Sequence, residues 1–262
     1  MQKTSRIILS AILTFLLLGV FVYFGRHQIV DVWHRWMIER ELPEPVSGPE
    51  SINIANSNLN SNIAPVVVTI PDEINLAVPF TTQAPYAKWD EQHNESCEEA
   101  AALTVYYWWQ KKIFTKEIAE DELQKMVDFQ NEKYGGYKDT DAQETAQLIK
   151  DLWGYKKVEV KYDITLDDIK KEVGQGRPVI LPTAGRELKN PYFRRPGPIY
   201  HMVVVRGYTK DKIITNDPGT KRGEEYIYDS DILYNAIHDW NDGDIYDGKK
   251  AMIVVYPAPF QE

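Results

Sequence analysis

The chain has 262 residues, of which 43% are hydrophobic, 26% are charged and 12% are aromatic. This composition excludes a disordered chain and a fibrous or disulfide-stapled one, and the length allows one sizeable domain or two small ones. The formal net charge of −9 argues against a nucleic-acid-binding protein, which normally presents a basic face. Residues 1–70 contain as many basic as acidic side chains, so the negative charge belongs to residues 71–262.

The first predicted element is a membrane-spanning helix within residues 1–28. Ile7–Phe24 contains no charged residue and is long enough to cross the hydrocarbon core of a bilayer. A cleaved signal peptide is the alternative, but its apolar region is shorter and ends in a small-x-small site, which residues 21–25 do not offer. Lys3 and Arg6 precede the segment, and the positive-inside rule places the rest of the chain outside the cytoplasm. We therefore expect a single-pass cell-membrane protein with an extracytoplasmic folded part.

A juxtamembrane segment and a linker follow over residues 29–70. Ile29–Arg40 interleaves tryptophan with charge, which is typical of an interfacial helix or of a continuation of the membrane helix. Residues 41–49 are rich in proline and acidic side chains, and residues 51–62 are rich in Asn and Ser. Such stretches cannot bury enough apolar surface to fold, so we expect a flexible tether in front of a folded domain over residues 71–262.

Within this domain the pattern is mainly helices first and strands afterwards. Apolar periodicity predicts helices at residues 97–112, 116–133, 140–153 and 165–173. Alternating or continuous apolar runs predict strands at residues 157–162, 178–182, 201–208, 212–216, 225–228 and 250–256. This order predicts an α+β domain in which a helical part packs on an antiparallel sheet.

Cys97 is the only cysteine of the sequence, and it begins the most apolar predicted helix after the polar residues 90–96. The partial positive charge and unpaired N–H groups at a helix N-terminus lower the pKa of a thiol and favour the nucleophilic thiolate. A lone cysteine is also often a buried small hydrophobe. Position alone therefore leaves both catalysis and packing open.

A thiol nucleophile needs a base, and the base needs an orienting group. His201 stands at the start of an apolar run, and Asp217 follows the next predicted strand in a turn sequence. If these two strands are antiparallel neighbours, the two side chains lie at the same end of the sheet. A buried, hydrogen-bonded histidine and an ordinary turn aspartate are the alternatives, and His93, four residues before Cys97, is a second candidate base.

Several segments resemble cysteine peptidase family 39 in its broad, papain-like sense. They are Val78–Pro85, Trp89–Asp90, Ser96–Ala100, Tyr200–Tyr208 and Ile214–Gly219, within a span of roughly Ile74 to Tyr256. The resemblance implies a papain-like fold and a peptidase in which Cys97 is the nucleophile, His201 the general base and Asp217 its orienting partner. It also implies that Gln83 donates to the oxyanion, with Gln92, five residues before the cysteine, as the competing donor.

The sequence departs from the leader-processing members of that family at two points. Those members have Gln close before a Cys-Gly pair, whereas here the interval from Gln83 is longer and Glu98 follows the cysteine. The sequence also lacks a Walker-type glycine loop, so it contains no ATPase segment. We expect a membrane-anchored cysteine peptidase acting on a peptide or protein substrate; a peptidoglycan amide hydrolase of similar chemistry and a catalytically silent peptide-binding module are the alternatives.

We expect a monomer with no cofactor, no metal and no nucleic-acid partner. The acidic stretch Asp239–Asp244 faintly resembles a calcium loop, but its glycine stands one place early and no closing glutamate follows at the right distance. A solvated acidic loop is the better interpretation.

Overall fold

The structure is a computed structural model that describes residues 42–47 and 70–256. By its contacts the chain divides into two units, residues 1–42 and residues 43–262, and the elements named below belong to the second. The expected membrane helix lies outside the described residues. Among the helices that are described, none has both the length and the apolar character of a membrane span.

A short stretch of the expected linker lies against the folded domain. The Val46 N–H donates to the Asn75 carbonyl (2.7 Å), and the Ala77 N–H donates to the Val46 carbonyl (2.9 Å). This pairing lies beside strand β1 (Ile74–Asn75), and the Val46 side chain packs on the core. The backbone groups of Val46 are paired and its side chain is partly buried. Residues 43–47 are therefore fixed to the domain rather than free.

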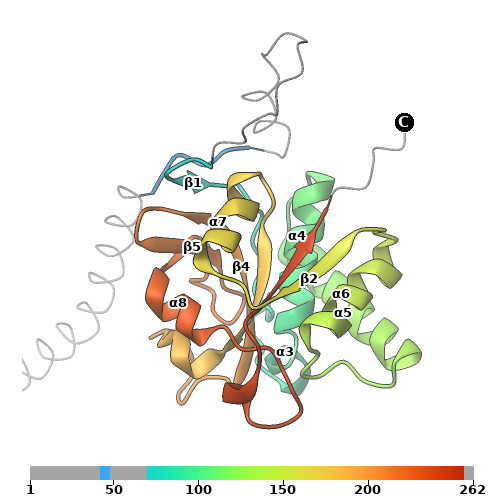
Figure 1. Ribbon diagram of the computed structural model, residues 1–262. Coiled ribbons are helices and arrows are strands. Elements are labelled where there is room, and N and C mark those ends of the chain that lie inside the picture. The colour runs from blue at the N-terminus through green and yellow to red at the C-terminus, as the bar shows by residue number, and fades with distance from the viewer. Residues whose placement is uncertain (1–41, 48–69, 257–262) are drawn as a thin grey trace, which may run out of the picture. The chain divides into compact units, whose positions relative to one another are not determined.

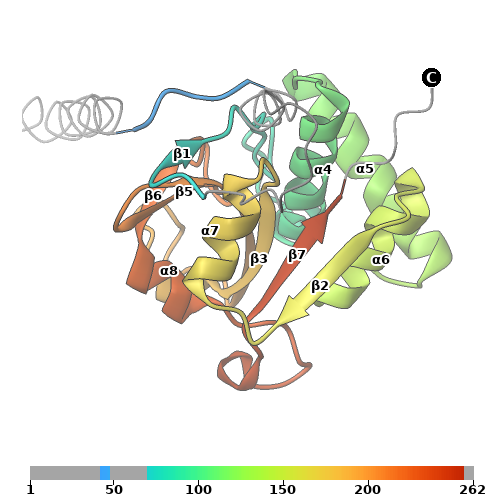
Figure 2. The same cartoon turned by 45° about the horizontal axis from the view of Figure 1, so that its top comes forward.

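In the described part of the chain, the helices α3 to α6 precede most of the sheet and group on one side of the domain (Figures 1 and 2). They are α3 (Glu91–Asn94), α4 (Cys97–Gln110), α5 (Lys116–Lys133) and α6 (Ala142–Trp153). The first two turns of α4 are buried, since Ala100–Ala102 let the helix approach its neighbours closely. A capping box at the start of α6 joins Asp141 and Glu144 through reciprocal backbone bonds, which satisfies N–H groups that a helix start leaves unpaired.

The described strands form one antiparallel sheet in the order β2-β7-β3-β4-β5-β6, with β1 paired to β4. Their bounds are β2 (Val158–Tyr162), β3 (Val179–Ala184), β4 (Tyr200–Tyr208), β5 (Lys212–Asn216), β6 (Tyr226–Asp229) and β7 (Ala251–Val255). Every residue of β4 is buried, because α4 and α7 (Leu166–Gly174) both pack on this strand.

Shorter elements complete the sheet side of the domain. The 3₁₀ turn η1 (Gly185–Leu188) opens the connection from β3 to β4, and helix α8 (Ser230–Ala236) follows β6. A second 3₁₀ turn, η2 (Ile245–Asp247), lies in the acidic loop before β7. The predicted α+β class is confirmed, with helices packed on an antiparallel sheet as expected.

A glycine allows the first strand to join the sheet. The pairing of β4 with β5 shifts register between Val205 and Gly207, which marks a bulge. A Cβ atom at Gly207 would lie 2.3 Å from the Ile74 carbonyl oxygen. Because that distance is far below van der Waals contact, β1 can lie against β4 only where the strand has no side chain.

Candidate active site

Cys97 is the first residue of α4 and lies at the junction of the helical part and the sheet. Its side chain is 5% exposed. The thiol donates a hydrogen bond to Glu98 Oε2 (3.0 Å), and the backbone N–H of Met202 in β4 donates to the sulfur. Since Met202 directly follows His201 in the chain, the sulfur lies against the strand that carries the expected base.

The electrostatic setting of Cys97 differs from the expected one. Burial, and then the carboxylate of Glu98, raise the pKa of the Cys97 thiol well above its ordinary value, although the Met202 N–H acts in the opposite direction. The expectation of a lowered thiol pKa is therefore wrong for this state of the site. The dipole of α4 acts on the sulfur, but loss of water and an adjacent carboxylate outweigh it.

His201 and Asp217 are brought together as the strand order predicts. His201 lies near the start of β4 and Asp217 directly after β5, and these strands are antiparallel neighbours. His201 Nε2 and Asp217 Oδ1 are 2.8 Å apart, and the residues are 1% and 0% exposed. This bond leaves His201 Nδ1 as the ring nitrogen that can exchange a proton.

Asp217 is held ionised by a set of donors. Its Oδ1 also accepts from the Gly219 N–H (2.9 Å), and its Oδ2 accepts from Tyr228 Oη (2.5 Å) and Asn190 Nδ2 (3.0 Å). Burial opposes ionisation of this carboxyl, but the His201 ring and the donors together hold its pKa below the usual value. The sequence analysis missed Asn190 and Tyr228, because they reach Asp217 from a loop and from a strand that are distant in the chain.

Gln83, Cys97 and His201 line one cleft, which has a volume of about 920 Å³. Asp217 is not part of the cleft surface and lies behind His201. In this structure the thiol donates to Glu98 and not to the imidazole. The cleft therefore holds a thiol and an imidazole, and no hydrogen bond joins the two in this structure.

The two candidate oxyanion donors have different surroundings. Gln83 Nε2 donates to the carbonyl oxygens of His93 (2.7 Å) and Asn94 (3.1 Å), and its Oε1 is buried without a hydrogen-bond partner among the described residues. Gln92 is not part of the cleft lining and donates to Gln124 on the surface (3.0 Å). Of the two candidates, only Gln83 therefore lines the cleft that contains Cys97.

His93 is excluded as the base by its own hydrogen bonds. Its Nδ1 lies 2.5 Å from Asp90 Oδ1 and its Nε2 lies 3.0 Å from Glu120 Oε1. Both ring nitrogens are thus occupied by carboxylates, and neither faces the thiol. The His93 side chain instead attaches the short helix α3 to helix α5, just before Cys97 in the chain.

Two buried acids follow the cysteine. Glu98 and Glu99 are 1% and 0% exposed, and burial raises the pKa of Glu98 well above its usual value and that of Glu99 to about 7. Gln130 Nε2 donates to Glu99 Oε1 (2.5 Å). In the described residues, Glu99 Oε2 and Gln130 Oε1 have no hydrogen-bond partner, so the neutral acid, which has an O–H donor, suits this site better than the carboxylate.

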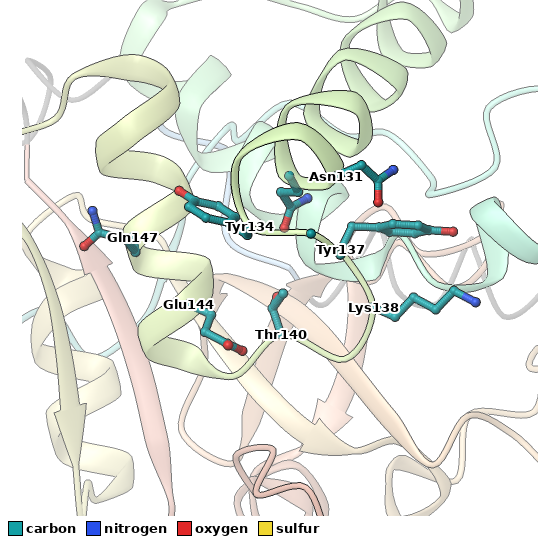
Figure 3. Close-up of a pocket in the computed structure, with 10 residues that line it drawn as sticks. Asn131, Tyr134, Tyr137, Lys138, Thr140, Glu144 and Gln147 are labelled. Carbon is teal, nitrogen blue, oxygen red and sulfur yellow. The ribbon is translucent and has the colours of Figure 1, made fainter.

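A second cavity lies in the helical part. It has a volume of about 630 Å³ and is lined by residues of α5, α6 and the loop between them (Figure 3). Tyr134 and Tyr137 are among the side chains drawn there, together with Lys138 and Glu144. None of Gln83, Cys97 and His201 lines it, so it is separate from the cleft.

The comparisons with known proteins identify a family for this chain. The family model described as "Peptidase_C39 like family" matches residues 75–242, which is well over half of the chain. A solved structure of a proposed C39-like peptidase from Bacillus anthracis shares 17% sequence identity, covers 72% of this chain and 100% of its own chain, and has a TM-score of 0.48. No curated protein matches the chain. On the extent of the family match, the chain belongs to the Peptidase_C39-like family.

Proposed function

We propose that the domain is a cysteine peptidase that hydrolyses peptide bonds by a Cys-His-Asp mechanism. The observation that carries the proposal is the buried His201–Asp217 pair (2.8 Å) beside a cleft that also contains Cys97. A thiol at a helix N-terminus, with an oriented imidazole on a sheet across from it, is the arrangement that amide hydrolysis requires. Membership of a peptidase family supports the same reaction.

The first step is transfer of the thiol proton to His201 Nδ1. The thiol must turn from Glu98 towards the imidazole, and Asp217 stabilises the imidazolium that forms. The thiolate then attacks the carbonyl carbon of the substrate, and a carbon–sulfur bond forms as the carbonyl π electrons move to oxygen.

The oxyanion is stabilised by the Cys97 backbone N–H and by Gln83. An amide group has two N–H donors, so Gln83 can keep its 2.7 Å bond to the His93 carbonyl and turn the other hydrogen from Asn94 to the oxyanion. The imidazolium then protonates the leaving amine as the carbon–nitrogen bond breaks. Water, activated by the same imidazole, hydrolyses the thioester and restores the thiol.

Turnover of quenched fluorescent peptides by purified variants tests the roles. Cys97→Ala and His201→Ala should each lose nearly all activity, and Asp217→Asn should lose less because it only orients and stabilises the imidazole. An epoxide inhibitor should label one thiol per chain and abolish turnover in the same proportion. Undiminished cleavage by Cys97→Ala would contradict the mechanism, and labelling without turnover would favour a silent binding module.

An assay with purified peptidoglycan distinguishes a peptidase from a peptidoglycan amide hydrolase that uses the same chemistry. We expect release of peptide fragments from protein substrates and none from cross-linked peptidoglycan. The opposite result would keep the Cys-His-Asp chemistry and reassign the substrate to cell-wall amides.

We further propose that Ile7–Phe24 anchors the protein in the cell membrane with the peptidase domain outside the cytoplasm. The uncharged apolar segment and the preceding Lys3 and Arg6 support this orientation. A reporter fused after Glu262 should be active outside the cytoplasm, and protease added to spheroplasts should release the domain. A domain that is reached only after lysis would reverse the orientation.

A further inference from the structure

The cleft carries an unusual excess of positive charge for an acidic protein. Arg194 and Arg195 line it from the connection between β3 and β4, and Lys221 and Arg222 line it from the connection between β5 and β6. The whole chain has a net charge of −9. The charge of these four side chains is therefore opposite in sign to the net charge of the protein.

These cations stand next to the reacting groups. Phe193, which directly precedes Arg194, packs edge-on against the His201 ring with centroids 5.2 Å apart. Gly219, two residues before Lys221, lies so close to the ring that a Cβ there would be 2.9 Å from His201 Cε1. Both cationic loops thus reach the cleft beside the base, where residues next to the cleaved bond would bind.

Hydrogen bonds fix the beginning of the loop between β3 and β4, so Arg194 and Arg195 have defined positions. Asn190 donates to Asp217 Oδ2 (3.0 Å) and to Tyr228 Oη (2.9 Å), and the Tyr192 N–H donates to Asn190 Oδ1 (3.0 Å). The Arg222 guanidinium lies 4.5 Å from the centre of the Tyr192 ring, which joins the second loop to the first. The two loops form one wall.

Three of these cations lack a carboxylate partner in the protein. Among the described residues, Arg194, Arg195 and Lys221 take part in no ion pair, and all three are exposed. The carboxylates that line the cleft, Glu95 and Asp139, come from the helical part. Burial raises the pKa of both carboxyls, and the cation that acts in the opposite direction on both is Lys138. The cationic wall is therefore available to a ligand.

We propose that this wall selects peptide substrates with acidic side chains next to the cleaved bond, an inference that rests on the proposed peptidase function. An exposed charge pair changes an equilibrium constant by about 1.4- to 5-fold, so three or four such contacts change kcat/KM by about 3- to 900-fold between acidic and neutral peptides. Because exposed charges are screened within about 10 Å at 0.1 M salt, the preference decreases as ionic strength rises. The acidic body of the protein repels such a peptide elsewhere, which directs it to the cleft.

The test uses matched peptides that carry Asp, Asn or Lys at the positions around one cleaved bond. We expect kcat/KM to fall from the Asp to the Asn to the Lys peptide, with the largest difference at low salt. The variant Arg194→Glu/Arg195→Glu should invert the order. The control Lys116→Glu/Lys156→Glu makes the same charge change at exposed lysines outside the cleft and should keep the original order.

Binding separates this inference from the peptidase function. Fluorescence anisotropy of the same labelled peptides on full-length Cys97→Ala should show the Asp peptide binding most tightly, whether or not any peptide is cleaved. Equal binding and equal cleavage of the three peptides would overturn the charge selection while leaving the peptidase intact. Absence of cleavage together with tight binding of the Asp peptide would overturn the peptidase and retain the acidic ligand.

Discussion

Cys97 and Glu98 form a contact that protects the thiol in the absence of substrate. A thiol that donates to a buried acid resists ionisation, because ionisation of both groups would place two negative charges 3.0 Å apart. Glu98 is thus placed to keep the Cys97 thiol protonated.

Glu98→Gln should lower the pKa of the Cys97 thiol. The substitution removes the adjacent negative charge and leaves an amide that can donate to a thiolate. We expect the pH profile of iodoacetamide labelling to move to lower pH and the rate at pH 7 to increase. Glu95→Gln, a cleft carboxyl with no hydrogen bond to the thiol, serves as the control; a Glu98→Gln profile that overlays the wild type would contradict this role.

Gln83→Ala should reduce kcat by about 10²–10³ with little change in KM, as removal of an oxyanion donor does. Gln92→Ala is the matched control, since this side chain donates to Gln124 on the surface. Steady-state kinetics of the two variants side by side check the assignment. A large loss for Gln92→Ala with a near-normal rate for Gln83→Ala would reverse it.

Glu99 should make stability depend on pH. Because burial raises its pKa to about 7 from about 4.5, the folded protein keeps a proton that the unfolded chain releases between these values, and the free energy of unfolding falls as pH rises through this range. Glu99→Gln lacks this titration, so its Tm relative to the wild type should increase from pH 5 to pH 8. The control Glu132→Gln, at an exposed position of the same helical part, should show a Tm difference from the wild type that does not change with pH. A pH-independent Tm difference for Glu99→Gln would mean that ionisation of Glu99 does not destabilise the fold.

At the scale of single residues, the sequence could predict the groups that belong to short motifs and not those that meet through the fold. Cys97, His201 and Asp217 each stand in a recognisable segment, and the helix and the two strands that position them were predictable. The partners Asn190 and Tyr228 converge on Asp217 only because β5 and β6 pair and a long loop folds back. Glu98 was visible as a departure after the cysteine, but its contact with the sulfur depends on side-chain orientation.

Among the elements, the turn after β5 shows how a loop can position the base. Gly219 donates its N–H to Asp217 Oδ1 (2.9 Å) and lies against both Phe193 and His201. A side chain here would have to displace a ring, because a Cβ would lie 2.8 Å from Phe193 Cε1.

Gly219→Ala should therefore reduce kcat more than it reduces stability. The new methyl group displaces His201 or Phe193 and disturbs the geometry of proton transfer, whereas Gly219 itself is partly exposed and is not part of the hydrophobic core. Peptide turnover and urea unfolding measured on the same preparation check this expectation. Gly243→Ala is the control, since a Cβ there meets nothing closer than 3.7 Å. Equal kcat values for both variants would contradict the expectation that a methyl group at position 219 displaces His201 or Phe193.

The long elements were predictable because their apolar periodicity is strong, and the short ones were not. Helices α4, α5, α6 and α7 begin and end within a few residues of the predicted bounds. Strand β1 has two residues and helix α3 has four, so neither contains a full period. Helix α8 has seven residues and directly follows β6, where the strand pattern masks its start.

Across the whole molecule, the order of the sheet could not be read from the order of the chain. β7 comes last among the described elements, yet it lies between β2 and β3. Ile253 pairs with Val160 on one side and with Ile180 on the other, and it is fully buried. Nothing in the alternation of residues 250–256 distinguishes an inserted strand from an edge strand.

Ile253→Ala should destabilise the whole domain by about 2–5 kcal/mol, as truncation of a buried isoleucine does. Urea unfolding followed by tryptophan fluorescence measures the loss, and activity should disappear at the same denaturant concentration because both sides of the cleft depend on the sheet. Ile113→Ala, at a position that is 80% exposed, is the control. A small effect at Ile253 would mean that β7 is not part of the stable core.

The inserted position of β7 has a consequence for the newly synthesised chain. A ribosome delivers the segments of Cys97 and His201 well before residues 251–255, but the strands β2 and β3 cannot be joined until that last strand arrives. The nascent chain therefore carries its thiol and its imidazole before the sheet is complete, since β2 is not yet joined to β3. On the proposed function, peptide hydrolysis would begin only after synthesis has passed Val255, because the sheet is complete only then.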